Sequence, residues 1–322
     1  MRSFAAFRSA SDSLFNSSFH LFLMDVKDLK SNHEEFLNVG FQATNIGRAI
    51  ELIERMKKDK ATIFFSFTAN MVASGLRGLF AEMCKRKFVD AIITTGGSLD
   101  HDLIRTKMDY GIGDFTMNDS ELHKKGVNRL GNILIKNECY EFLEKEITKV
   151  FEKIYDDERT TSPSTIAKEI GNSVSDKGSF LYWCSKNKIP VFSPGITDSA
   201  IGLQTYFFKQ RYADFGIDVT KDMKQLADIV LNADKTGGIV LGGGISKHHT
   251  IGVNLLRGGL DYAVYVTTAS PWDGSLSGAR TQEAVSWGKI AEQAKHVTVD
   301  CDATIAFPLI MKKILLRRPL GI

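Results

Sequence analysis

A lysine close behind a tryptophan is the first candidate for chemistry in this chain. Trp287-Gly-Lys289 lies just beyond residues 272–280, a loop rich in glycine and serine. An aromatic wall that excludes water disfavours the ammonium form, so the pKa of such a lysine can fall from about 10.4 toward roughly 7–8. An unprotonated lysine attacks a carbonyl or imine carbon and forms a Schiff base. A surface lysine whose stem lies over an indole gives the same pattern, so the pair alone indicates a candidate nucleophile.

Two neighbouring histidines supply a candidate base. His248 and His249 follow three glycines, near the start of an expected helix. Adjacent residues do not share a helix face, so we do not expect the two rings to bind one metal ion together. A histidine that faces a cleft can act as a general base near neutral pH, whereas a lone histidine is more often a packing or surface residue. The four cysteines lie far apart without a Cys-x-x-Cys pair, which favours a reducing compartment and no metal site.

A regular alternation of strands and helices is expected to position these residues. Apolar runs typical of buried strands end in small or polar turns, and helical patterns follow them. This rhythm is typical of parallel strands joined by crossover helices. We therefore predict an α/β fold with a doubly wound, mostly parallel, Rossmann-like sheet flanked by helices on both faces. The expected strands span 62–66, 89–94, 131–135, 189–193, 238–241, 262–266 and 297–299, and expected helices include 45–58, 140–155, 165–170, 180–187 and 248–257.

The ends of the expected strands indicate where a ligand should bind. In an open parallel sheet, ligands bind beyond the carboxyl ends of the strands. Here those ends carry small residues, and glycines before a helix expose N–H groups that suit a phosphate. Gly242–Gly244 is one such turn, but it is not a G-x-G-x-x-G fingerprint, and a tight structural turn explains it equally well. Asp198 and Asp302 could each bond a ribose hydroxyl or cap a helix.

Composition narrows the classes of function. The 322 residues include 41 basic and 38 acidic side chains, and the net charge of +3 is too small to indicate a nucleic-acid partner. No apolar run reaches the roughly 18 residues that a membrane span needs. Residues 1–23 could pass for a weak organellar transit peptide, but we interpret them as a flexible arm or a spurious extension before Met24. Residues 24–322 are expected to form one catalytic domain.

Several motifs together resemble one enzyme family. Their types and order over residues 39–309 are similar to those of the deoxyhypusine synthase family, in particular its archaeal-type members, and the last two motifs are the most specific. The motifs are Phe67-Thr-Ala-Asn70 with Ser74-Gly75, Thr94-Thr-Gly-Gly97, Ser193-Pro194 with Thr197-Asp198, Leu241-Gly-Gly-Gly-Ile-Ser-Lys-His-His249, Asp273-Gly-Ser275 with Ser277-Gly-Ala279, and Glu283-Ala-Val-Ser-Trp-Gly-Lys-Ile290.

The resemblance implies an NAD-dependent aminobutyl transfer. In this family NAD takes hydride from spermidine, and a lysine that matches Lys289 attacks the resulting imine. Diaminopropane leaves, and the butylimine passes to a lysine of translation initiation factor 5A. The resemblance implies that His248 is the base. It also implies a cytoplasmic homotetramer whose active sites are shared across a dimer interface.

The resemblance further implies which residues bind the two ligands. We expect NAD to contact Ala69, Asn70, Met71, Val72, Ala73, Thr95, Gly96, Gly97, Asp198, Gly243, Gly244, Thr268, Ala269, Asp302 and Ala303. We expect the amine to contact Asp100, His101, Gly274, Ser275, Ser277, Gly278, Ala279, Glu283 and Trp287. No residue is expected to bind a metal.

The expected amine site departs from the pattern of eukaryotic members. Those members carry a carboxylate pair where this chain has Asp100-His101, and single acids where it has Leu203 and Leu276. Because a buried unpaired ammonium is costly, fewer acids indicate an amine that is anchored differently. Three other functions stay open: aminobutyl transfer to a free diamine, as in homospermidine synthases, an inactive NAD-binding regulatory paralogue, and a generic Rossmann-like NAD-binding module.

Overall fold

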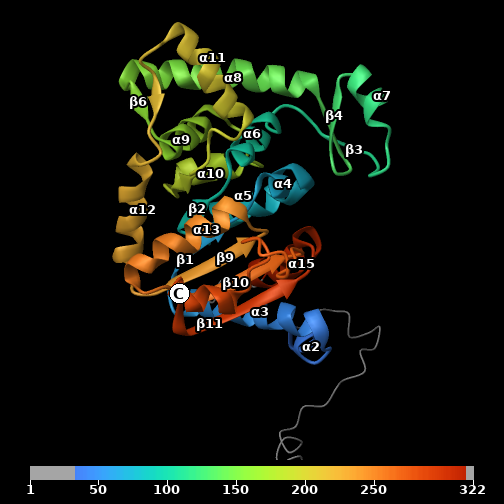
Figure 1. Ribbon diagram of the computed structural model, residues 1–322, viewed down its shortest axis with the longest axis vertical. Helices are drawn as coiled ribbons and strands as arrows, with labels where there is room; N and C mark the ends of the chain where they lie inside the picture. The colour runs from blue at the N-terminus through green and yellow to red at the C-terminus, as the bar shows by residue number, and fades with distance from the viewer. Residues whose placement is uncertain (1–32, 317–322) are drawn as a thin grey trace, which may run out of the picture.

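A six-stranded parallel sheet forms the centre of the computed structural model, which describes residues 33–316 (Figure 1). The expected extension at residues 1–23 lies outside this range. The strands are β1 (Thr62–Ser66), β2 (Ala91–Ile93), β7 (Val191–Phe192), β9 (Thr236–Leu241), β10 (Leu260–Thr267) and β11 (Ile290–Asp300). Their spatial order is β11-β10-β9-β1-β2-β7, so the chain builds one half outward from β1 and the other outward from β9. This is the order of a Rossmann sheet, and it confirms the predicted fold class.

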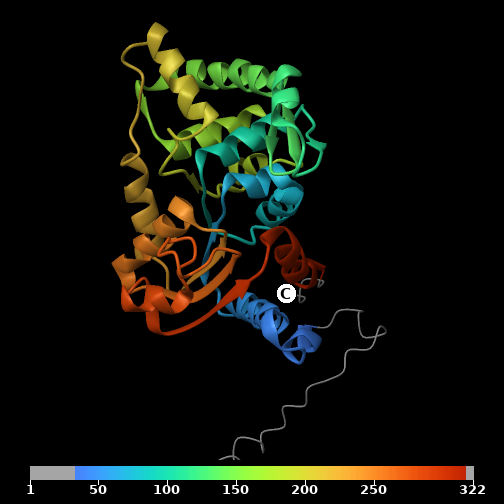
Figure 2. The ribbon, with the colours of Figure 1, turned by 45° about the vertical axis from the view of Figure 1, so that its right-hand side comes forward.

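The two faces of the sheet pack on different helices because successive side chains of a strand point in opposite directions. Phe65 of β1 points to the face where it contacts Phe80 edge-on and stacks with Phe307. Phe64 points to the other face and shares a core with Tyr265 of β10. The first face is covered by α3 (Phe41–Lys58), α5 (Arg77–Lys85) and α15 (Ala303–Leu316), and the second by α12 (Lys221–Leu231), α13 (Gly244–Val253) and α14 (Thr281–Ser286) (Figure 2).

A layer of helices extends the fold beyond the edge strand β7, at the top of Figure 1. It holds α8 (Asn137–Asp157), α9 (Pro163–Ser173), α10 (Phe180–Asn187) and α11 (Ala200–Arg211), with β6 (Thr160–Thr161) paired to β8 (Gly216–Ile217). The apolar face of α8 packs there on aromatic side chains, since Phe151 lies 5.5 Å from Phe208 and 5.3 Å from Phe215 between ring centres. The helices predicted at 140–155, 165–170 and 180–187 are therefore confirmed.

A small antiparallel sheet stands apart from the main sheet. It consists of β3 (Gly111–Ile112), β5 (Ile133–Lys136) and β4 (Val127–Leu130), and α7 (Asp119–Lys124) lies beside it. The strand predicted at 131–135 is β5, but its partner β4 was not predicted. Gly131, with a φ of 62°, makes the tight turn that joins the two strands.

Strand-to-helix turns gather at the carboxyl edge of the main sheet. After β1, α4 (Ala69–Met71) passes through a π-helical turn (Val72–Leu76), where Gly75 has a φ of 111° that suits glycine. After β2, α6 (Gly96–Ile104) starts at once, and after β9, α13 starts at Gly244 with a φ of 68°. The remaining short helices are α2 (His33–Leu37), beside α3, and a 3-10 helix (Asn254–Arg257), which ends at Gly258 with a φ of 86°. The helix predicted at 248–257 thus corresponds to the second part of α13 and this 3-10 helix.

Candidate active site

Lys289 and His248 meet beside the first residue of β11. The helix α14 ends at Ser286, with Trp287 as its C-cap. Gly288, with a φ of 66°, then turns the chain so that the Lys289 N–H donates to the Ala284 carbonyl oxygen (2.9 Å). His248 lies in the first half of α13, and its Nε2 is 3.2 Å from Lys289 Nζ. The fold thus brings the two expected catalytic residues into contact.

The surroundings of His248 keep its ring neutral. Partial burial and, secondly, the positive charge of Lys289 lower the pKa of His248 below its usual value. A neutral imidazole next to an ammonium can accept the proton that the amine must lose before it attacks. His249 faces a different side of the helix, and burial lowers its pKa as well.

The outer face of Trp287 is open in the single chain. The indole is 66% exposed, although Lys289 Nζ lies 5.3 Å from its ring centre. Within one chain the ring therefore offers a cation–π contact but does not exclude water from Lys289. The dry wall stays a prediction, because the pattern Trp-x-Lys does not specify what covers the outer face of the indole.

A cavity of about 270 Å³ surrounds the Lys289–His248 pair. It brings together five of the predicted catalytic and amine-binding residues, namely Lys289, His248, Trp287, Glu283 and Ala279. Glu283 is the carboxylate of this lining, and it lies among the basic side chains of Lys247, Arg280 and Lys289. The lining also includes Lys247, Ile251, Leu276, Arg280 and Ala284.

The glycine- and serine-rich loop closes over the start of α13. The Gly244 N–H donates to Ser277 Oγ (3.1 Å), and the Ser275 N–H donates to Asp273 Oδ1 (2.7 Å) within the loop. Gly278 is needed at its position, because a Cβ there would lie 1.7 Å from the Ser270 carbonyl oxygen. The loop is therefore tightly folded, with Gly274 at an open turn of positive φ.

Lys247 is a residue of this site that the sequence analysis did not single out. It is 1% exposed, and its Nζ donates to the carbonyl oxygens of Leu276 (2.8 Å) and Ala279 (2.5 Å). The same Nζ lies 4.5 Å from the ring centre of Tyr265. Burial lowers the pKa of Lys247 to about 8, and the charge of Glu283 opposes that shift.

The predicted amine contacts Asp100 and His101 lie elsewhere, on α6. Asp100 accepts the N–H groups of Ala200 (2.8 Å) and Ile201 (3.0 Å), so it caps α11, and burial raises its pKa to about 6. His101 Nδ1 is 2.8 Å from the Tyr110 hydroxyl, and burial lowers its pKa to about 4. Neither residue lines the Lys289 cavity of its own chain.

The predicted NAD contacts all lie at the carboxyl edge of the sheet. They follow β1 (Ala69–Ala73), β2 (95–97), β7 (Asp198), β9 (243–244), β10 (268–269) and β11 (302–303). Asp198 is exposed, whereas Asp302 caps α15 by accepting the Thr304 N–H (2.7 Å). None of these residues lines the Lys289 cavity.

This edge has features that suit a dinucleotide. The helices α4 and α6, whose N-termini lie there, begin without a side-chain cap, which leaves N–H groups for an anionic ligand, whereas the first N–H of α13 donates to Ser277 Oγ. Two turns pack closely, since a Cβ at Gly97 would lie 2.9 Å from Ala69 Cβ. Among the described residues, Thr95 Oγ1 is also buried without a hydrogen-bond partner.

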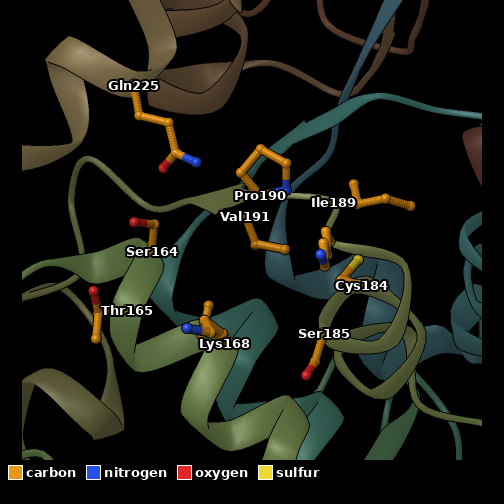
Figure 3. A pocket seen from close by; sticks show the side chains of 11 residues that line it. Ser164, Thr165, Lys168, Cys184, Ser185, Ile189, Pro190, Val191 and Gln225 are labelled. Atoms are coloured by element: carbon orange, nitrogen blue, oxygen red, sulfur yellow. The ribbon is translucent and has the colours of Figure 1, made fainter.

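A second cavity, of about 420 Å³, lies beside the edge strand β7 (Figure 3). Side chains of α9 and α10 point toward it, among them Ser164, Lys168 and Cys184. It contains none of the predicted site residues. Across residues 33–316, no three His, Cys, Asp or Glu side chains group as metal ligands, and no helix is long and apolar enough to cross a membrane.

The fold defines the chain as a Rossmann-like α/β protein with a lysine–histidine pair beside its sheet. The family model of deoxyhypusine synthase matches residues 33–314. The chain therefore belongs to the deoxyhypusine synthase family and is an enzyme of that family. Membership supports aminobutyl transfer in hypusine formation as its class of reaction.

Similar proteins agree with this assignment. A protein of Thermoplasma acidophilum named "Probable deoxyhypusine synthase" is 46% identical, over 86% of this chain and 90% of its own length. One of Pyrococcus furiosus with the same name is 42% identical, over 92% and 93%. A crystal structure of an Entamoeba histolytica protein assigned to deoxyhypusine synthase has a TM-score of 0.67 at 26% identity, covering 91% of this chain and 96% of that one.

Proposed function

We propose that this enzyme transfers the 4-aminobutyl group of spermidine, through an imine on Lys289, to a lysine of translation initiation factor 5A. The observation that carries the proposal is the 3.2 Å contact between Lys289 Nζ and His248 Nε2 in a cavity that also holds Glu283. A nucleophile, a neutral base and one carboxylate are the groups that an amine-transfer site needs.

In the proposed reaction Lys289 is the nucleophile and His248 is the base. His248 accepts a proton from the Lys289 ammonium, and the freed lone pair attacks the imine carbon of the oxidised donor. A bond from Lys289 Nζ to carbon forms, and the bond from that carbon to the departing diaminopropane nitrogen breaks. His248 can return its proton to the leaving amine. The acceptor lysine then attacks the same carbon, a bond from its nitrogen to that carbon forms, and the bond from the carbon to Lys289 Nζ breaks.

Glu283 and Trp287 supply recognition of a cation. The Glu283 carboxylate lies in the cavity wall, and the exposed Trp287 ring offers a π face to an ammonium group. We expect Ser275 and Ser277, which belong to the loop that carries the lining residues Leu276 and Ala279, to add hydroxyl groups to the amine site. Leu276, which also lines the wall, suits the apolar methylene chain of a polyamine.

NAD is the cofactor that we propose for the carboxyl edge of the sheet. Uncapped helix N-termini, the close turns at Gly97 and the unpaired Thr95 hydroxyl fit a pyrophosphate there. The chemistry that NAD supplies when bound is acceptance and return of a hydride, so the transfer involves no net redox change. We propose that Asp198 and Asp302 accept ribose hydroxyls.

The active site is proposed to be shared between two chains of a cytoplasmic homotetramer, each with one catalytic domain spanning residues 24–322. Two features support sharing. The NAD edge and the pair Asp100-His101 do not line the Lys289 cavity of their own chain, and the outer face of Trp287 is uncovered. A second chain would bring the two halves together and exclude water from Lys289.

An acceptor assay tests the proposal. The enzyme is incubated with NAD and spermidine labelled in its butyl carbons, together with factor 5A, a free diamine or no acceptor. We expect the label on one lysine of factor 5A, and no transfer when NAD is omitted. Label on the diamine alone would replace the proposal with a homospermidine-type reaction, and no transfer to either acceptor would contradict both.

A further inference from the structure

The buried ammonium of Lys247 has an unusual set of partners. Within residues 33–316 no carboxylate is ion-paired with it, and its two hydrogen bonds go to main-chain carbonyl oxygens, those of Leu276 and Ala279. Leu276 and Ala279 are the ends of one turn, since the Ala279 N–H also donates to the Leu276 carbonyl oxygen (3.2 Å). Burying a charge costs free energy unless polar groups satisfy it, so the position requires a long cationic side chain that joins α13 to this turn.

We propose that Lys247 is a positioning residue, whose ammonium fastens the turn 276–279 to α13 and so holds one wall of the cavity against His248. For brevity we call residues 276–279 the clamped turn. Because Lys247 and His248 are neighbours on α13, they point to different sides of that helix. One contacts the clamped turn and the other contacts Lys289, so a single helix sets both sides of the site.

Two further contacts hold the clamped turn on the same helix. The Gly244 N–H donates to Ser277 Oγ, and a Cβ at Gly243 would lie 2.4 Å from Ser277 Cα. The backbone of the turn therefore lies directly on the first residues of α13. Lys247 bonds the turn one helical turn further along, which fixes its orientation as well as its distance.

The contacts of Lys247 also distinguish it from a second nucleophile. An ammonium has three donors and no acceptor. Two of these donors point to carbonyl oxygens, and the charge lies over the Tyr265 ring face. The charged groups that influence it are Glu283 on α14 and Arg280 at the end of the loop. Attack by this nitrogen would require the clamped turn to leave, whereas Lys289 already contacts a base.

Release of the clamp should weaken amine binding more than it weakens the Lys289 chemistry. Leu276 and Ala279 belong to the cavity wall, whereas the Lys289–His248 contact does not involve Lys247. In Lys247→Met, which keeps the length and removes the charge, we expect the KM for the donor amine to rise about 10-fold or more, with a smaller change in kcat. This kinetic expectation rests on the proposed function.

The clamp itself is tested without any substrate, by hydrogen–deuterium exchange. In Lys247→Met the amides of residues 277–280 should exchange about 10-fold faster or more than in the wild type, while amides of β9 and β10 are unchanged. Lys168→Met, which removes an exposed charge from α9, is the matched control and should exchange like the wild type. Unchanged exchange at 277–280 in a folded Lys247→Met protein would overturn the proposal.

A pulse of an amine-acetylating reagent on the wild-type protein covers the case in which Lys247→Met does not fold. Lys247 should be acetylated about 100-fold more slowly than the exposed Lys295, because it reacts only when the clamped turn opens. Equal rates would overturn the proposal. Both measurements omit substrate and cofactor, so they decide on the clamp whatever the acceptor assay shows.

Discussion

Lys289 Nζ lies 3.2 Å from His248 Nε2, so the imidazole can take the proton that the amine must lose before it attacks. The two side chains come from α13 and from the residue before β11, which the sheet holds side by side. This contact gives each residue a separate, testable role.

Replacement of Lys289 by arginine should abolish transfer while the protein still binds NAD. A guanidinium stays protonated at all accessible pH values and cannot attack an imine carbon. We expect kcat to fall by a factor of about 10³ or more, and NAD affinity, measured by fluorescence titration, to stay within about two-fold, because the predicted NAD contacts lie at another edge of the sheet. Substantial transfer by this variant would rule out Lys289 as the nucleophile.

The pH dependence of transfer should have an acidic limb that belongs to His248. The base works as the neutral ring, and burial and Lys289 lower the pKa of His248 below 6.5. Activity should therefore persist to pH values somewhat below 6.5 and then fall as the ring becomes protonated. His248→Gln should lower kcat by about 10²–10⁴ and remove this limb, whereas the matched variant His249→Gln should keep it. A limb that survives in His248→Gln would assign it to another group.

The loop should tolerate no side chain at Gly278. A Cβ there would lie 1.7 Å from the Ser270 carbonyl oxygen, so Gly278→Ala must displace the backbone near the cavity. We expect kcat/KM for the donor amine to fall by about 10²-fold, the loss that misplacement of about 1 Å can cause. Gly252→Ala on α13 is the control, because nothing lies within 4 Å of a Cβ at that position. Equal kinetics for the two variants would show that the loop conformation does not matter.

A buried ion pair outside the site should dominate the stability of the layer beyond β7. Asp102 is fully buried, pairs with Arg77 Nε (2.6 Å) and accepts the Ser179 hydroxyl (2.6 Å). Asp102→Asn removes the carboxylate that pairs with the buried Arg77 guanidinium. We therefore expect the free energy of unfolding, measured in urea, to drop by roughly 3 kcal/mol. Asp119→Asn breaks an exposed pair with Arg129 and should leave the unfolding midpoint unchanged. Similar midpoints for both variants would contradict this account.

The core of the fold could be predicted because its strands are continuously apolar. The strand predicted at 62–66 matches β1, and those at 238–241 and 262–266 lie within β9 and β10. The strand predicted at 297–299 is the last part of the longer β11. The first part was missed because β11 lies at the edge of the sheet, where polar side chains such as Glu292 and Lys295 face solvent and interrupt the apolar pattern.

The candidate site could be predicted in part. The motif around Lys289 and His248 indicated both residues, and the structure places them in contact. Lys247 was overlooked because a buried lysine and a solvated one look alike in a sequence, and its partners are main-chain oxygens 29 and 32 residues away. The exposure of Trp287 likewise depends on neighbours that no local pattern specifies.

Reductive trapping is the measurement that tests the central role of Lys289 most directly. The enzyme is mixed with NAD and labelled spermidine, without acceptor, and sodium borohydride is added before digestion and mass spectrometry. The account predicts a labelled butylamine adduct on Lys289 and none on Lys247, and no adduct when NAD is omitted. An adduct on Lys247 instead, or the absence of any adduct from an enzyme that still transfers the aminobutyl group, would contradict it.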